Sequence, residues 1–262
     1  MGADVAGDVE TIARAFVTAR RAGRALSGYP GVKPGLLADG YAVQDVAIAL
    51  SGGTVAGWKV GKIDPPIDGV DRLAGPIFAD RIVHADPPPA MAIFAGGFAA
   101  AEAEFLLRLG RQPDPARTAY TLAEARALID AVHIGIEIAS SPFDGINRHG
   151  PAVTVSDFGN NNGLVVGAEL PGWRDADVNA IAVELLVNGE RVGAGTAAMM
   201  LDGPFGAARF LLEHMAARGI ELPAGTWISS GAVTGVHAVA AGDAVEARFD
   251  GKYSARCTIK PH

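Results

Sequence analysis

The sequence predicts an α+β fold, in which a small helical annex at the N-terminus precedes a β-rich body. Helical periodicity is confined mainly to about the first 50 residues, short β-rich runs punctuated by Gly and Pro follow, and two tight hairpins are signalled later. Few crossover helices separate the strands, which disfavours a doubly wound sheet. A chain of 262 residues can form one large domain with a smaller annex. We place the annex at residues 1–70 and the catalytic body at residues 71–262.

The annex is predicted to contain two helices. Apolar residues recur at helical spacing over residues 5–17, which predicts an opening helix that runs to about Leu26. The segment Asp39–Ser51 predicts a second helix, which Gly52-Gly53 ends.

The body is predicted to contain two further helices among its strands. Thr121 and Glu124 have the spacing of a capping box, and the apolar stripe that follows predicts a helix over Leu122–His133. Another helix is expected between Asp202 and Gly219, since Pro follows closely after the first and Gly is typical of a helix end.

Two hairpins have the clearest local signals in the chain. Asn188-Gly189 and Asp250-Gly251 each separate two β-rich runs. These dipeptides favour the primed turns that match the twist of antiparallel strands. We therefore expect two-residue hairpin loops at both places.

Composition and charge exclude several classes of protein. The formal net charge is −7 and no run of Lys or Arg occurs, which argues against a nucleic-acid partner. Cys257 is the only cysteine, so it cannot form an internal disulfide, and we expect it to be a buried apolar residue. The acidic N-terminal segment lacks a signal-peptide pattern, and no apolar run is long enough to span a membrane. The expectation is a cytoplasmic protein with no membrane contact.

A pair of glutamates is the first candidate for chemistry. Glu102 and Glu104 lie in a segment typical of a strand, where a period of two places both carboxylates on one face. If that face is buried, the two like charges need a cation, a proton or a basic partner. The alternative is an ordinary solvated strand face.

Glu137 is the third carboxylate in unusual surroundings. It alternates with isoleucines and is flanked on its own face by Gly135 and Ala139, whose small size could leave room for a ligand or metal. The alternative is an exposed edge strand. Three oxygen donors without a His or Cys cluster would favour magnesium, manganese or calcium over zinc.

Polar groups elsewhere could complete a site. Lys59 lies between glycines on a short β-rich run, where it could act as a base of lowered pKa or stay charged and hold a carboxylate. An exposed structural lysine is the alternative. Asn161 and Asn162 belong to an amide-rich segment suited to gripping a substrate carboxylate, although a cluster of turns would have the same composition.

Six segments carry a resemblance to a known family. Their order and spacing are similar to the family pattern over most of the chain, at Tyr41–Gln44, Gly57–Gly61, Ala101–Phe105, Ile136–Ser141, Val187–Gly195 and Ser229–Gly235. The chain resembles the 2-keto-4-pentenoate hydratases of the fumarylacetoacetate hydrolase superfamily, which also includes 2-oxo-3-hexenedioate decarboxylases.

The resemblance implies a mixed-β fumarylacetoacetate-hydrolase-like body, homo-oligomeric assembly and a small 2-oxo acid as substrate. It implies a divalent cation, Mg²⁺ or Mn²⁺, held by the three glutamates described above. Lys59 matches the family's active-site lysine, and Asp80 looks like the acidic residue that works with it in proton transfer. Gln44 is expected to contribute to the substrate pocket.

The resemblance leaves the reaction open. The expected activity is that of a hydratase, a hydro-lyase that adds water to a 2-hydroxyalka-2,4-dienoate to give a 4-hydroxy-2-oxo acid. Alternatives are decarboxylation of a 2-oxo-3-hexenedioate, hydrolysis of an acylpyruvate, or a non-catalytic subunit that binds a 2-oxo acid. Hydrolysis is less favoured because no His/Glu dyad for water activation can be placed. The chain departs from the better-known hydratases at Asp157–Gly163 and Leu201–Gly206, where substrate specificity could be set.

Overall fold

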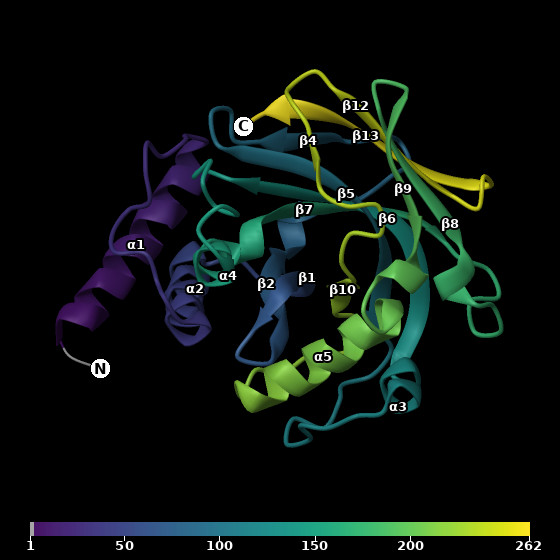
Figure 1. Ribbon diagram of the computed structural model, residues 1–262, viewed down its shortest axis with the longest axis horizontal. Helices are drawn as coiled ribbons and strands as arrows, with labels where there is room; N and C mark the ends of the chain where they lie inside the picture. Colours follow the sequence, from purple (N-terminus) through teal and green to yellow (C-terminus); the bar gives the residue numbers. More distant parts are fainter. Residues whose placement is uncertain (1–2) are drawn as a thin grey trace.

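Two β-sheets lie in layers, and two helices form an annex at one end of the molecule (Figure 1). The computed structural model describes the chain from residue 3 to residue 262, with side chains from residue 8 onward. The helices are α1 (Ala3–Ala22), α2 (Leu37–Ser51), α3 (Leu122–Arg126), α4 (Pro151–Ser156) and α5 (Gly203–Ala217), with short 3₁₀ turns η1 (Ala79–Arg81), η2 (Phe158–Asn160), η3 (Val178–Ala180) and η4 (Ala197–Met199). This arrangement confirms the α+β prediction.

The larger sheet has eight strands and the smaller has five. The larger follows the order β2-β1-β10-β5-β6-β7-β3, with β11 also paired to β5, and the smaller follows β4-β13-β12-β8-β9. The strands are β1 (Val55–Ile67), β2 (Val70–Phe78), β3 (Ile82–His84), β4 (Ala90–Ile93), β5 (Phe98–Leu109), β6 (Ile129–Ser141), β7 (Asn161–Glu169), β8 (Ala182–Val187), β9 (Glu190–Thr196), β10 (Trp227–Ser229), β11 (His237–Ala238), β12 (Ala244–Phe249) and β13 (Tyr253–Pro261).

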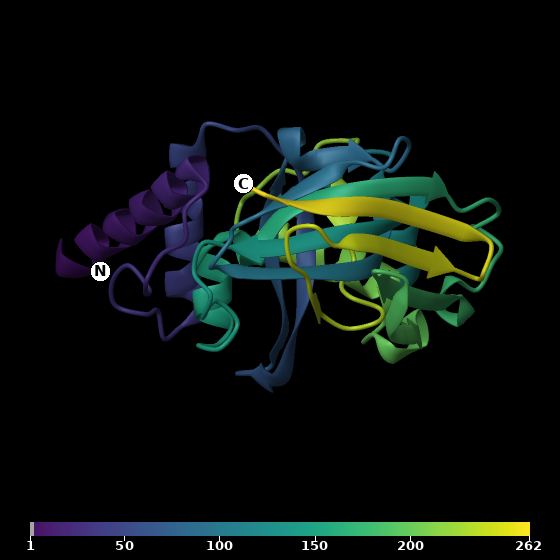
Figure 2. The same cartoon turned by 90° about the horizontal axis from the view of Figure 1, so that it is seen from above.

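The main core lies between the two sheets. In Figure 2 the yellow strands β12 and β13 of the smaller sheet lie over the teal strands of the larger sheet. Phe105 of β5 meets Phe249 of β12 edge-to-face, with ring centroids 5.2 Å apart. Cys257 is buried in the same core, as expected for the only cysteine of the chain. Strands β5 and β6 are buried on both faces. One face packs against the smaller sheet, and the opposite face lies on the inner side of the larger sheet. The second face is where the glutamates lie.

The annex packs against the body through a second apolar cluster. Ile12 and Phe16 of α1 and Val43 of α2 join Phe143 and Val153 of the body there. Helix α1 ends at Ala22, earlier than the predicted Leu26, because the next residue, Gly23, takes a left-handed conformation (φ 62°). Strand β1 pairs within the larger sheet although it lies before residue 70, and the division into annex and body stays a prediction.

Local sequence patterns predicted both hairpins correctly and one helix incorrectly. Asn188-Gly189 joins β8 to β9 and Asp250-Gly251 joins β12 to β13, with both first residues at φ 53°. The helix predicted over Leu122–His133 was wrong: the capping box is present, but α3 ends at Arg126 and the chain enters β6 at Ile129. The β-branched residues beyond that point bury one face against the core through pairing with β5, which outweighs the helical spacing.

None of the helices in the described part of the chain combines the length and apolar character that crossing a membrane requires.

Candidate metal and active site

Two neighbouring strands bring three carboxylates together. Glu102 and Glu104 project from one face of β5, as alternation along the strand predicts, and Glu137 of β6 lies directly opposite Glu102 in the antiparallel register. All three are buried, and each offers an oxygen within 4.8 Å of the others. We call these residues the carboxylate triad. It is the one such group among the residues that the structure describes.

Gly135 leaves room for a packed side chain, whereas the sequence suggested that it leaves room for a ligand or metal. It precedes Glu137 on the same face, and a Cβ built there would lie 2.3 Å from the Leu106 side chain. The absence of a side chain therefore makes room for Leu106, not for a ligand.

The triad is oriented by hydrogen bonds from neighbouring strands and a loop. Asn161, at the start of β7, donates its amide to Glu137 Oε1 at 2.8 Å. The Ser229 hydroxyl donates to Glu104 Oε2, and the Gly231 backbone N–H donates to the same oxygen at 2.9 Å. Glu104 Oε1 is buried and accepts no hydrogen bond. A buried carboxylate oxygen without a donor is a natural position for a cation.

Lys59 of β1 extends to the triad. Its Nζ lies 3.3 Å from Glu137 Oε2 and 3.2 Å from Asn160 Oδ1. Lys59 is buried as well, so the sequence-based alternative of an exposed lysine does not hold. Burial alone would lower the pKa of Lys59, but attraction to the carboxylates outweighs burial and the pKa is raised.

Burial has the opposite consequence for the glutamates. It raises the pKa of Glu102 to about 7, against the opposing charge of Lys59. Burial, together with repulsion from Glu137 and Glu102, holds the pKa of Glu104 well above its ordinary value. Were all three carboxylates ionised, they and the one ammonium would leave two negative charges uncompensated. A divalent cation would balance them, and an all-oxygen donor set suits Mg²⁺ or Mn²⁺. The residues present therefore fit such a cation.

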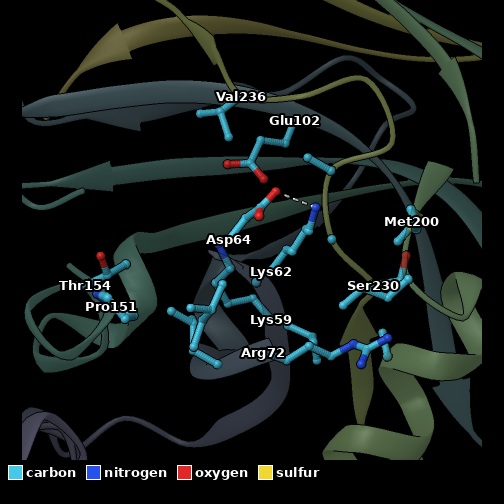
Figure 3. A pocket seen from close by; sticks show the side chains of 18 of the residues that line it. Lys59, Lys62, Asp64, Arg72, Glu102, Pro151, Thr154, Met200, Ser230 and Val236 are labelled. Carbon is cyan, nitrogen blue, oxygen red and sulfur yellow. Dashed lines mark hydrogen bonds and ion pairs between the residues drawn. The ribbon is translucent and has the colours of Figure 1, made fainter. Parts of the chain in front are cut away.

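Lys59 and Glu102 line a cavity of about 600 Å³ (Figure 3). Figure 3 shows Lys59, Glu102 and Ser230 among its lining side chains, with Thr154 and Pro151 on one wall and Met200 on the other. Buried reactive groups at the inner end of a cavity are typical of an active site.

Comparison with known proteins decides the family. The description "Fumarylacetoacetate (FAA) hydrolase C-terminal" belongs to the sequence family that matches residues 89–260. The chain belongs to the fumarylacetoacetate hydrolase family. The family assignment confirms the resemblance seen in the sequence, and the carboxylate triad lies within the matched region.

Individual relatives fall into two named activities. A 2-keto-4-pentenoate hydratase 1 from Dechloromonas aromatica is 30% identical over 226 residues, which is 80% of this chain and 81% of the relative. A 4-oxalocrotonate decarboxylase from Pseudomonas putida is 29% identical over 130 residues, so this chain matches about half (49%) of that protein's length.

Solved structures of other proteins share the fold. The 4-oxalocrotonate decarboxylase from Pseudomonas putida G7, complexed with magnesium and adipate, superposes with a TM-score of 0.79 at 23% identity, over 96% of this chain and 97% of that one. The fumarylpyruvate hydrolase from Pseudomonas aeruginosa, in complex with Mn²⁺ and pyruvate, gives 0.59 at 16% identity, over 78% and 89%.

Four residues that the sequence assigned to substrate binding or proton transfer lie outside the cavity. Asp80 follows the end of β2 in η1, where its side chain is 75% exposed and pairs with Arg81 at 3.6 Å. Gln44 is buried but donates its amide to two backbone carbonyls. Asn161 faces Glu137 instead of the cavity, and Asn162 donates to the Ala92 carbonyl. The structure therefore does not bring Asp80 to Lys59.

Asn160 and Ser230 line the cavity and were missed. Asn160 ends three consecutive residues with left-handed backbone (φ 57°, 60° and 61°), so the first asparagine of the run faces Lys59 while the next faces Glu137. The turn is held against β2, because a Cβ on Gly75 would lie 2.1 Å from the Phe158 carbonyl. The Gly and Asn composition of the run was the only available signal.

Proposed function

We propose that this chain is a metal-dependent hydratase that adds water to a 2-hydroxyalka-2,4-dienoate and forms a 4-hydroxy-2-oxo acid. The observation that carries the proposal is the convergence of the carboxylate triad on Lys59, with Lys59 and Glu102 lining one cavity. Three hydratase relatives match over about four fifths of their length, which supports this reaction over others of the family.

The carboxylate triad would hold the cation, with Asn161 and Ser229 fixing the orientation of two of its members. When bound there, Mg²⁺ or Mn²⁺ supplies positive charge that offsets the negative charge developing on a substrate 2-oxo oxygen. The chain itself excludes water from this inner end, because Lys59 and all three glutamates are buried.

Lys59 would handle protons. Its raised pKa keeps the side chain an ammonium at neutral pH, which makes it a donor rather than a base at the start of the reaction. The dienol gains a proton at C5 as its 2-hydroxyl loses one, and water then adds its hydroxyl at C4 while a proton reaches C3. Asn160 accepts a hydrogen bond from Lys59 and so directs Nζ at the cavity. The proton-transfer role expected for Asp80 has no support from its position.

The test measures dienoate absorbance and product mass with Mg²⁺ present. Wild type should consume the dienoate and yield a product heavier by one water. Glu104→Gln should lose the reaction and the binding of Mg²⁺, whereas Glu169→Gln, an exposed glutamate on neighbouring β7, should retain both. An unchanged rate in Glu104→Gln would contradict the proposal.

Decarboxylation is the second candidate, favoured by the match to 4-oxalocrotonate decarboxylases over half of the chain. A 2-oxo-3-hexenedioate would lose its distal carboxylate as carbon dioxide, with the electron pair passing through the conjugated system to the 2-oxo group. Product mass separates the candidates: gain of water, loss of carbon dioxide, or two fragments for hydrolysis. Binding of oxalate without turnover would indicate a non-catalytic subunit. Light scattering would test the expected homo-oligomer.

A further inference from the structure

Exposed apolar side chains gather around the mouth of the cavity. Among the described residues, nine large apolar side chains are exposed, and four of these line this one cavity. These four, which we call the outer wall, are between 41% and 81% exposed: Ile67, Met199, Leu201 and Val236. They come from the end of β1, from η4 and the turn that follows it, and from the loop after β10. Clustered exposed apolar surface indicates a binding site.

The cations that line the cavity are already paired. Arg72 bonds to Asp71 at 3.0 Å and to Asp202 at 3.1 Å, while Lys62 bonds to Asp64 at 2.7 Å (Figure 3). The third cation, Lys59, faces the carboxylate triad. A second carboxylate on a substrate would therefore meet no unpaired cation among the described lining residues. It would also face apolar surface, which makes its desolvation unfavourable.

We propose that the outer wall is an apolar subsite for the far end of the substrate. The chain then accepts 2-oxo acids and dienoates that carry an uncharged alkyl end, and it discriminates against those that end in a second carboxylate. The cavity volume of about 600 Å³ lies within the range of about 300–1,000 Å³ that holds drug-sized ligands, so it has space for a longer chain. The reaction at the inner end rests on the proposed function, whereas binding at the outer wall does not.

The first measurement is the affinity of straight-chain 2-oxo acids, by calorimetry with the Mg²⁺-loaded protein. Affinity should rise about fourfold for each added methylene from 2-oxopentanoate to 2-oxooctanoate, the gain expected for burial of one methylene. The dicarboxylate 2-oxoadipate should bind more weakly than 2-oxohexanoate, which has the same number of carbons. An affinity independent of length, or tighter binding of 2-oxoadipate, would overturn the subsite.

A matched pair of variants assigns the effect to the outer wall. Leu201→Ser should reduce the gain per methylene, whereas Leu122→Ser, at a leucine of α3 with nearly the same exposure but outside the cavity, should leave it unchanged. If Leu201→Ser alters only the oligomeric state and not the dependence on length, the surface belongs to a second copy of the chain and the subsite is wrong.

The same series keeps the two proposals distinguishable. A length-dependent affinity without hydration of any dienoate would overturn the proposed function and leave the subsite standing. Hydration in which kcat/KM does not increase from the unsubstituted dienoate to its methyl and ethyl homologues would overturn the subsite alone.

Discussion

Arg20→Met should be one of the most damaging substitutions outside the cavity. Arg20 of α1 forms a two-pronged ion pair with Asp157, with Nε–Oδ1 at 2.5 Å and Nη2–Oδ2 at 2.9 Å. The guanidinium also lies 4.9 Å from the centroid of the Phe158 ring and 5.5 Å from that of Phe94. The Asp157 side chain is fully buried, so removal of Arg20 leaves a carboxylate without its cation.

The expected cost is about 3–5 kcal/mol in the free energy of unfolding, as for other buried pairs that lose one partner. For a chain of this size, that corresponds to a fall in melting temperature on the order of 10 °C. Metal affinity should fall as well, about tenfold, because Arg20 also bonds to the Asn161 carbonyl and Asn161 orients Glu137. Chemical denaturation and Mg²⁺ calorimetry measure the two effects.

Two controls separate this mechanism from general damage to α1. Arg14→Met removes an exposed ion pair with Glu10 on the same helix and should cost less than about 1 kcal/mol. Asp157→Asn combined with Arg20→Met should recover part of the loss, because the buried charge is gone. The reasoning is refuted if Arg20→Met is as stable as Arg14→Met.

Three other outcomes are expected. Ser229→Ala removes a donor to Glu104 and should weaken Mg²⁺ binding about tenfold by calorimetry. The raised pKa values of Glu102 and Glu104 mean that the folded metal-free chain binds more protons than the unfolded chain, so its stability should fall as pH rises through about 7. The melting-temperature gain from Mg²⁺ should therefore grow with pH, and a constant gain would contradict this. Burial and the charge of Arg218 lower the pKa of His214 to about 4, so stability should fall as pH drops below about 6.5. His214→Leu should flatten the acid limb of a melting-temperature profile, and a limb as steep as that of wild type would exclude His214 as its cause.

Much of the site followed from local patterns. Alternation along β5 placed Glu102 and Glu104 on one face, since strand geometry depends only on neighbouring residues. The position of Glu137 opposite Glu102 depends on the register between β5 and β6, which no local pattern shows. The family resemblance supplied that link.

The features that could not be predicted from the sequence depend on contacts between distant segments or on an unusual backbone conformation. Arg20 and Asp157 are 137 residues apart, and neither has neighbours that indicate the other. Asn160 lies one residue before the predicted pair Asn161 and Asn162, and only its left-handed backbone determines which asparagine faces the lysine. Asp80 has a suitable residue type, but it lies beyond the end of β2 and is carried away from the site.

The close approach of Gly75 to the Phe158 carbonyl has a consequence for changing the substrate range. The turn that ends at Asn160 is fixed by contact between two backbones, so the reach of Lys59 does not depend on the side chains near the mouth. The residues of the outer wall instead lie in turns, in a loop and at the free end of a hairpin, where substitutions are tolerated best. A library of variants confined to the outer wall can be screened for new substrates while the chemistry at the inner end of the cavity stays constant.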